Sequence, residues 1–259
     1  MNFWLPIVVF LTTTITAQAE TLRLAVTTSF ANSGLSDVLI PVAEAETGLD
    51  IQLLVVGTGQ ALRLGEAGDV DAVLVHARAQ EEAFVAAGHG THRREIMFND
   101  FVLVGPKDDP AGTQNMPTAR AAFVAIADRQ SPFVSRGDDS GTHTREQALW
   151  AQAAIVPTGD WYRAVGQGMG AALNIAAAID AYILTDRASW LSFGNTRNLT
   201  LLFADDPALF NQYTFIQVTP KAGDTRAQRL EDWLVSPAAR DLINGHRIAG
   251  QQLFEFNAK

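Results

Sequence analysis

One loop joins an expected strand to an expected helix, and with its flanks it reads Phe133-Val134-Ser135-Arg136-Gly137-Asp138-Asp139-Ser140-Gly141-Thr142-His143. A helical pattern follows in Thr144–Trp150. A strand, a loop and a helix in this order direct free backbone N–H groups and the positive end of a helix dipole at one point. Hydroxyl donors and an arginine beside that point complete a site for a small oxyanion. We therefore call Arg136–Thr142 the anion loop.

The composition limits the class of protein. A chain of 259 residues suits one large domain or two lobes of ordinary size. Hydrophobic residues at 47% and charged residues at 18% are typical of a soluble globular protein. The net charge of −9 argues against a nucleic-acid binder, which would show a basic face. It does not exclude an anion site, because a small site is decided by nearby donors and net charge governs long-range steering.

The chain begins with the pattern of an export signal. Residues 1–19 contain the apolar run Phe3–Leu11, and Ala17-Gln18-Ala19 follows as an A-x-A cleavage site. The segment before the run carries no Lys or Arg, which departs from the usual signal. A short membrane anchor is the alternative, but the run is shorter than the roughly 20 residues that span a bilayer. We therefore expect cleavage next to Glu20 and a periplasmic mature protein.

The sequence contains no cysteine. An exported chain of this kind has neither disulfides nor a lipid-anchoring cysteine, so we expect it to be free in the periplasm after cleavage. The same lack excludes thiol nucleophiles, iron–sulfur clusters and cysteine zinc sites.

Strands and helices alternate along the first part of the mature chain. Apolar strand patterns and amphipathic helix patterns occur at residues 22–26 (strand), 34–46 (helix), 51–56 (strand), 70–75 (strand) and 80–87 (helix). Thr47-Gly48 ends the first helix, because glycine suits the left-handed conformation at a helix end. This order predicts an α/β fold with a parallel sheet.

Two later segments repeat one pattern. Asn99–Pro106 and Asn211–Pro220 each read Asn, a polar residue, an aromatic residue, alternating apolar residues and then Pro. The residues between them have strand and helix patterns of their own. We expect two lobes joined by two crossing strands, with lobe one at residues 20–101 and 215–259 and an inserted lobe two at residues 102–214. The alternative is a single sheet with two similar edge strands.

Four polar loops each follow an apolar strand and precede a helix. They are Thr27-Thr28-Ser29, Gly57-Thr58-Gly59, the anion loop Arg136–Thr142, and Thr185-Asp186-Arg187. In an open α/β sheet, ligands bind outside the carboxyl ends of the strands, so a ligand between the lobes would meet all four loops. A single Ser or Thr at a helix start is more often only an N-cap. Four such loops in corresponding places predict a binding site.

The acids of the anion loop leave alternatives open. Arg136 could be a surface arginine that pairs with Asp138 or Asp139, and Asp139 could cap the following helix. Ser140 and Thr142 could also act only as caps. In the ligand-binding interpretation, an exposed Arg136 and both hydroxyls face the space between the lobes.

The chain resembles one known family over nearly the whole mature sequence. The motifs occur in order at residues 25–35 (AVTTSFANSGL), 56–62 (VGTGQAL), 71–77 (DAVLVHA), 98–106 (FNDFVLVGP), 135–143 (SRGDDSGTH), 166–170 (GQGMG) and 185–187 (TDR). Together they resemble the periplasmic tungstate-binding proteins of ABC importers, the TupA-like family. No single motif is specific, but the joint set is.

The resemblance implies a class II, two-lobed periplasmic substrate-binding protein that binds tungstate between the lobes and molybdate more weakly. The contacts that it implies are Thr28, Ser29, Thr58, Arg136, Ser140 and Thr142. It also implies binding without catalysis, no cofactor, a monomer, and delivery to an inner-membrane ABC permease with its ATPase. The chain departs from the family at Val26 and Phe30, where relatives often carry threonine, so a further hydroxyl of the first loop is in doubt.

The chemistry of the anion separates a tungstate receptor from a phosphate receptor. Tungstate and molybdate are fully ionised near neutral pH, so their site needs hydrogen-bond donors only. Phosphate keeps a proton and rewards a carboxylate acceptor, whereas an unpaired carboxylate repels tungstate. Asp138 or Asp139 pointing between the lobes would favour phosphate. The same acids turned onto helix N–H groups or Arg136 would favour tungstate.

A secreted hydrolase or metal enzyme is the alternative from another class. The five histidines are His76, His89, His92, His143 and His246. His89 and His92 with Glu95 could suggest a metal site, but two neighbouring arginines would repel a cation. The sequence contains no G-x-S-x-G motif, and no serine has an obvious base partner. We expect His143 to orient a group next to the anion loop.

Overall fold

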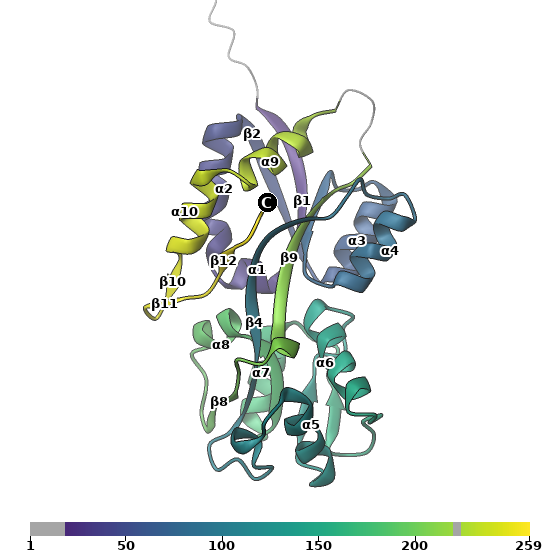
Figure 1. Ribbon diagram of the computed structural model, residues 1–259, viewed down its shortest axis with the longest axis vertical. Coiled ribbons are helices and arrows are strands. Elements are labelled where there is room, and N and C mark those ends of the chain that lie inside the picture. The colour runs from purple at the N-terminus through teal and green to yellow at the C-terminus, as the bar shows by residue number, and fades with distance from the viewer. Residues whose placement is uncertain (1–18, 220–223) are drawn as a thin grey trace, which may run out of the picture.

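The computed structural model describes residues 19–219 and 224–259. It has two lobes, one above the other in Figure 1, and two strands pass between them. The predicted two-lobed α/β fold is confirmed. The expected export signal, Met1–Ala19, lies outside the described residues apart from Ala19. Within the described ranges, no helix has both the length and the apolar character required to cross a membrane.

The first lobe is built on a parallel sheet of β1 (Glu20–Thr27), β2 (Leu49–Val56) and β3 (Ala72–Val75). β1 lies between the other two strands and is parallel to both. The helices that follow these strands are α1 (Thr28–Asn32), α2 (Leu35–Thr47), α3 (Thr58–Ala67) and α4 (Arg78–Ala86). As predicted, α2 ends at Gly48, whose φ of 71° lies in the left-handed region.

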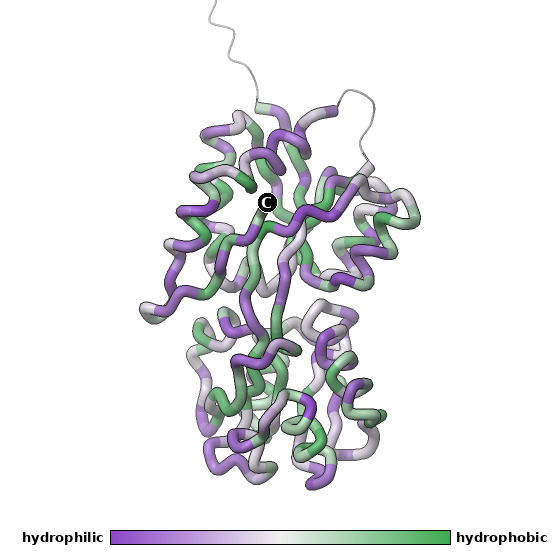
Figure 2. Tube along the Cα trace, viewed as in Figure 1, coloured by the Kyte–Doolittle hydropathy of each residue, from purple (hydrophilic) through white to green (hydrophobic). Residues whose placement is uncertain are grey.

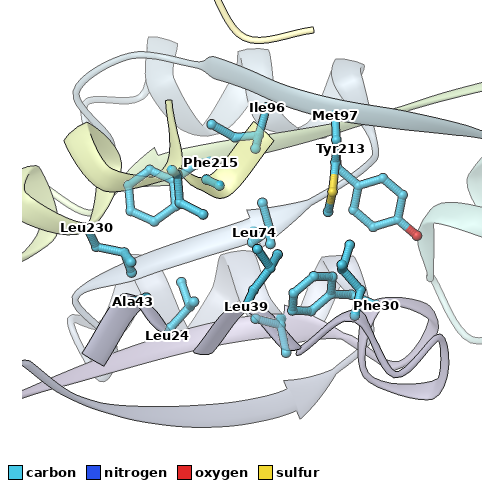
Figure 3. Close-up of a cluster of buried hydrophobic side chains, with 14 of the residues drawn as sticks. Leu24, Phe30, Leu39, Ala43, Leu74, Ile96, Met97, Tyr213, Phe215 and Leu230 are labelled. Atoms are coloured by element: carbon cyan, nitrogen blue, oxygen red, sulfur yellow. The ribbon is translucent and has the colours of Figure 1, made fainter. Parts of the chain in front are cut away.

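The C-terminal part of the chain returns to the first lobe. α9 (Arg226–Leu234) and α10 (Pro237–Gly245) pack against α2. The short strands that follow are β10 (Arg247–Ile248), β11 (Gln251–Gln252) and β12 (Glu255–Phe256). Figure 3 shows the core that they help to cover, in which Phe30, Phe215 and Leu230 gather from distant parts of the chain. Tyr213 lies in the same core, and its hydroxyl points away from the apolar side chains.

The second lobe has its own sheet and core. Its strands are β5 (Phe133–Ser135), β6 (Tyr162–Ala164), β7 (Tyr182–Asp186) and β8 (Leu199–Phe203). Its helices are α5 (Ala119–Asp128), α6 (Gly141–Gln152), α7 (Met169–Ala178) and α8 (Arg187–Ser192), with one-turn 3-10 helices at Thr113–Asn115 and Pro207–Leu209. Trp150 packs edge-on against Phe123 and Phe133, with ring centroids 4.4 and 5.3 Å apart. Separate apolar clusters of this kind explain why the lobes form distinct bodies.

The two segments that share a sequence pattern form the crossing strands, β4 (Arg94–Pro106) and β9 (Phe210–Gln217). They are antiparallel neighbours near the middle of the sheet order β2-β1-β3-β9-β4-β7-β5-β6, so the alternative of two edge strands is wrong. Asn99 lies opposite Asn211, and the Asn211 amide donates to Asn99 Oδ1 at 2.6 Å. Both strands turn hydrophilic where they pass between the lobes (Figure 2).

We expect Trp150→Ala to lower the free energy of unfolding by about 3–5 kcal/mol, because it leaves a large hole among the aromatic rings of the second lobe. Unfolding followed by circular dichroism or calorimetry measures this loss. Val156→Ala is the control, since that side chain is 84% exposed and the change should stay within about 0.5 kcal/mol. Equal effects of the two variants would contradict the described packing.

Candidate functional site

The loop after β1 places two predicted site residues at the start of α1. Thr27 caps this helix, because its Oγ1 accepts from the N–H of Phe30 at 3.3 Å. Thr28 is half-buried, and its hydroxyl has no hydrogen-bond partner among the described residues. The Thr28 hydroxyl is therefore available to a ligand.

Ser29 has a different environment from Thr28. Its buried hydroxyl is within hydrogen-bond distance of Thr27 Oγ1 (3.1 Å), His76 Nε2 (3.2 Å) and Tyr213 OH (3.0 Å). A hydroxyl has one donor and two acceptor positions, so these three partners use its whole capacity. The Ser29 side chain reaches a ligand only by giving up one of them, and its role here is to tie the first loop to β3 and β9.

Thr58 is the first residue of α3 and is fully buried. Its Oγ1 has no hydrogen-bond partner within the described part of the chain. The N-cap of this helix is Gly57, which offers no capping side chain. The first turn of α3 thus combines an unused hydroxyl with backbone N–H groups that no side chain caps.

Arg136 leaves β5 and opens the anion loop. We expected an exposed arginine, and this is wrong: the side chain is only 3% exposed. Its Nη2 donates to Asp138 Oδ2 at 2.5 Å, and its buried Nε has no acceptor among the described residues. A guanidinium can be buried when a carboxylate partner neutralises it, and Asp138, two residues along, provides that partner.

Ser140 and Thr142 lie at the start of α6. Ser140 is the N-cap, since its Oγ accepts from the N–H of His143 at 3.2 Å. The Ser140 N–H donates to Asp138 Oδ1 at 3.3 Å, so only the hydroxyl proton of Ser140 is left for a ligand. Thr142 Oγ1 is buried and has no partner in residues 19–219 and 224–259. Thr142 therefore resembles Thr58 of the other lobe, whose buried hydroxyl is also unpaired among the described residues.

Both acids of the anion loop are engaged. The two oxygens of Asp138 accept from Arg136 and from the N–H of Ser140. The Asp139 side chain is 70% exposed and lies 3.8 Å from Arg63 Nη1. Asp139 does not cap α6, because Ser140 occupies that position. Of the two outcomes considered for these acids, this is the one that favours a site made of donors.

The two lobes approach each other at these loops. A Cβ atom on Gly57 would lie 3.8 Å from Ser140 Cα. Gln80 Nε2, beyond β3, donates to Thr144 Oγ1, on α6, at 3.0 Å. Thr58 follows Gly57, and Thr142 lies between Ser140 and Thr144 in the sequence. The unused donors of the two lobes therefore meet at one boundary.

The fourth polar loop has mainly structural contacts, although the buried Asp186 Oδ2 has no hydrogen-bond partner among the described residues. Asp186 ends β7 and caps α8, accepting from the N–H of Ser189 at 2.8 Å, and burial raises its pKa. Arg187 Nε donates to Asp100 Oδ1, on the crossing strand β4, at 2.8 Å. Arg187 therefore holds the second lobe to the crossing strand and is not a free donor.

Sequence reasoning missed His76 and Tyr213. The two rings lie 4.7 Å apart, and both residues hydrogen-bond to Ser29. Burial, followed by the positive charge of Arg136, lowers the pKa of His76 to about 3, so its ring is neutral at neutral pH. A signal was present for His76, because it directly follows an apolar strand, like the residues of the four polar loops.

One of the two histidines considered for a metal site, His92, has another partner. His92 Nε2 lies 2.7 Å from Glu231 Oε1. No group of three or more His, Cys, Asp or Glu residues that could hold a metal occurs among the described residues. His143 Nδ1 accepts from the N–H of Asp139 at 3.2 Å, so His143 orients the anion loop as expected.

Comparison with known proteins identifies the family. A family model described as a PBP superfamily domain matches residues 12–243. The tungstate-binding protein TupA of Peptoclostridium acidaminophilum is 43% identical over 243 residues, which cover 91% of this chain and 85% of that protein. This chain belongs to the TupA family of the PBP superfamily. The predicted resemblance is confirmed.

Two solved structures of TupA-type proteins are similar over the same range. The tungstate ABC transporter structure from Geobacter sulfurreducens has 44% identity and a TM-score of 0.80, covering 87% of this chain and 98% of that one. The tungstate-binding protein TupA of Desulfovibrio alaskensis G20 has 43% identity and a TM-score of 0.78, covering 93% of this chain and all of that one. The family consists of substrate-binding proteins of transporters, whose role is binding. Transporter components of this kind are periplasmic.

Glu146 is a buried acid on the helix that follows the anion loop, and its titration can be tested. It lies on α6, and its Oε1 accepts from Tyr162 OH at 2.7 Å and from Trp150 Nε1 at 3.1 Å. Burial raises the pKa of Glu146 from 4.5 to about 7. A raised folded-state pKa stabilises the fold below the unfolded pKa, and this stability is lost as the pH rises through the folded pKa.

We expect Glu146→Gln to gain stability relative to the wild type as the pH rises from 4.5 to 7, by about 1–3 kcal/mol in total. Denaturant unfolding at several pH values measures the difference. The exposed Glu82→Gln is the control: its hydrogen bond from Arg78 lowers the pKa of Glu82, so its small pH dependence has the opposite sign. A pH-independent difference for Glu146→Gln would show that the carboxyl does not titrate in this window.

Proposed function

We propose that this protein is a periplasmic receptor that binds tungstate between its lobes, binds molybdate more weakly, and delivers the anion to an ABC permease with its ATPase. One observation carries the proposal. Thr58 Oγ1 from the first lobe and Thr142 Oγ1 and Arg136 Nε from the second are buried donors without an acceptor among the described residues. Buried donors are normally paired, so three of them at one boundary fit an anion that supplies the acceptors.

The remaining contacts come from the same loops. The Thr28 hydroxyl and the Ser140 hydroxyl proton are available, and Ser29 contributes through the network that fixes the first loop. Since Asp138 is bound to Arg136 and to Ser140, it presents no free oxygen to the ligand. The anion loop thus presents donors and no free carboxylate oxygen, which suits an anion that carries no proton. The phosphate receptor is therefore not favoured.

Ligand capture is proposed to occur by closure of the lobes. Lobe one comprises residues 20–101 and the C-terminal part of the chain, and the inserted lobe two begins at residue 102. Tyr213 packs in the first-lobe core, so we place the second crossing near Phe210–Asn211, a few residues before the expected boundary at 214/215. An anion that contacts both lobes binds the closed form better and shifts the population toward it.

We also propose that the protein only binds its ligand and catalyses no reaction. The protein acts as a monomer, uses no cofactor, and makes or breaks no bond. It is exported by a signal that is cleaved near Glu20. Mass spectrometry of the exported protein tests this part, and a retained amino terminus would overturn it.

Calorimetry tests the ligand. We expect tungstate to bind tightly, molybdate to bind less tightly, and sulfate and phosphate to compete poorly, because Thr58, Thr142 and Arg136 offer donors and both carboxylates of the anion loop are already engaged. Phosphate binding tighter than tungstate would refute the proposed function. The experiment uses the mature protein dialysed free of anions, with each anion titrated separately and in competition.

Arg136 tests the second-lobe half of the site. Arg136→Lys keeps the charge but loses the planar fork, so we expect tungstate to bind about tenfold more weakly or worse. Arg136→Ala should weaken binding more than a hundredfold, since it also leaves the Asp138 carboxylate unpaired beside the anion. Thr142→Val removes one neutral donor and should weaken binding about two- to tenfold. Calorimetry gives the affinities, and circular dichroism checks the fold.

The exposed Arg120→Lys, on α5 of the same lobe, is the matched control and should bind tungstate like the wild type. If Arg136→Lys also retained wild-type affinity, Arg136 would be a structural partner of Asp138 only. The second-lobe part of the site would then have to be assigned to other residues.

A further inference from the structure

Among the glycines whose added Cβ would meet the other lobe, Gly141, the first residue of α6, leaves the least room for a side chain. A Cβ atom on Gly141 would lie 2.4 Å from His76 Cε1 and 2.5 Å from His76 Nδ1. Real Cβ atoms do not come within 3.0 Å of such neighbours. We call this approach of the His76 ring to Gly141 the closure contact. It joins the end of β3 in one lobe to the start of α6 in the other.

Nothing within the second lobe itself requires glycine at position 141. Gly141 is not among the residues with positive φ, so its backbone is open to any L-residue. It lies in the first turn of a 12-residue helix, where alanine is a better helix former than glycine. The three heavy atoms nearest to an added Cβ all belong to His76. What excludes a side chain is therefore the other lobe.

His76 cannot move aside easily. Its ring is buried, and the ring centroids of Tyr213 and Phe101 lie 4.7 and 6.0 Å from its own. Its Nε2 is 3.2 Å from Ser29 Oγ. Tyr213 and Ser29 are themselves hydrogen-bonded to each other. A methyl group on residue 141 would have to displace this network or hold the lobes apart. An ordinary contact of 3.4 Å requires a displacement of about 1 Å from the present 2.4 Å.

We propose that the closure contact determines how far the lobes close, so that Gly141 controls the affinity for the anion without binding it. Thr142 is the next residue and Ser140 the previous one, so a side chain at 141 moves both away from the first lobe. Hydrogen bonds of about 2.7–3.2 Å do not survive an extension of about 1 Å. This inference rests on the proposed function only in that an anion bridges the lobes.

Two other glycines at the same boundary provide a graded series. An added Cβ on Gly59 would lie 3.1 Å from the Asp139 carbonyl oxygen, and one on Gly57 would lie 3.8 Å from Ser140. The contact is severe at Gly141, tight at Gly59 and ordinary at Gly57. We therefore expect the alanine variants to weaken anion binding in that order.

The test compares Gly141→Ala with Gly170→Ala. Gly170 lies in the first turn of α7, in the same lobe, with open space around an added Cβ. We expect Gly141→Ala to retain the thermal stability of the ligand-free protein and to bind tungstate more than a hundredfold more weakly. Gly170→Ala should bind like the wild type. Wild-type affinity in Gly141→Ala would overturn the inference.

A second readout follows closure directly. Because the chain has no cysteine, spin labels can be attached at Glu66→Cys on α3 and Val156→Cys in lobe two, both exposed sites. Electron–electron distance measurements should show a shorter distance with tungstate in the wild type and in Gly170→Ala, and no shortening in Gly141→Ala. Closure of Gly141→Ala to the wild-type distance would overturn the inference.

The His76→Ala background shows whether the ring is responsible. Gly141→Ala should weaken binding much less in that background than in the wild type, since the obstacle is gone. An equal loss in both backgrounds would exclude the closure contact as the cause.

Failure of the proposed function gives a different result. If sulfate or phosphate, and not tungstate, closes the labelled wild type, the ligand assignment fails and the same comparison is made with that anion. If none of the anions closes it, the ligand-free distance distributions decide. The wild type should then populate short distances that Gly141→Ala does not, and identical distributions would refute the inference.

Discussion

The structure depends on the passage of β4 from one lobe to the other. As far as Asp100 this strand pairs with β9, and from Phe101 it pairs with β7. A shift of one residue in this register would turn the core side chains of both lobes to the wrong face. A change in the angle between the lobes must be absorbed where the partner changes. There the side chains of Asn99 and Asn211 hydrogen-bond to each other, and the apolar cores lie on either side.

The pairing of Arg136 with Asp138 resolves a conflict in the sequence. An anion loop that contains two acids looks poorly suited to a doubly charged oxyanion, and the chain as a whole carries a net charge of −9. The conflict disappears because both carboxylate oxygens of Asp138 accept hydrogen bonds within the loop, one from Arg136 and one from the N–H of Ser140. The acid then fixes the guanidinium and the start of α6 in place. A neutral His76 next to them adds no second cation.

Much of this arrangement could be predicted from the sequence, and the failures share one cause. The alternation of strand and helix patterns in residues 22–56 predicted the parallel sheet, and the repeated Asn pattern predicted the crossing strands. Both are regularities within short stretches of sequence. The burial of Arg136 and the use of the Ser29 hydroxyl by three hydrogen-bond partners could not be predicted. Both arise from side chains that come together only in the folded protein. Tyr213 is 184 residues from Ser29 in sequence yet lies 3.0 Å away. The role of Gly141 was hidden for the same reason, because its constraint comes from a ring in the other lobe.

The unpaired donors of the proposed site also explain why closure of the two lobes would depend on a ligand. With the lobes together, Thr58 Oγ1, Thr142 Oγ1 and Arg136 Nε are buried without protein acceptors in the described part of the chain. Each buried, unpaired polar group costs roughly 1–3 kcal/mol relative to a hydrated one. Opening the lobes exposes them to water and removes that penalty, and an oxyanion removes it without opening. In the proposed function, the preference for the open form without ligand and for the closed form with ligand then has a single physical origin. In our proposal, Gly141 lets the lobes come close enough to bury these donors against the anion.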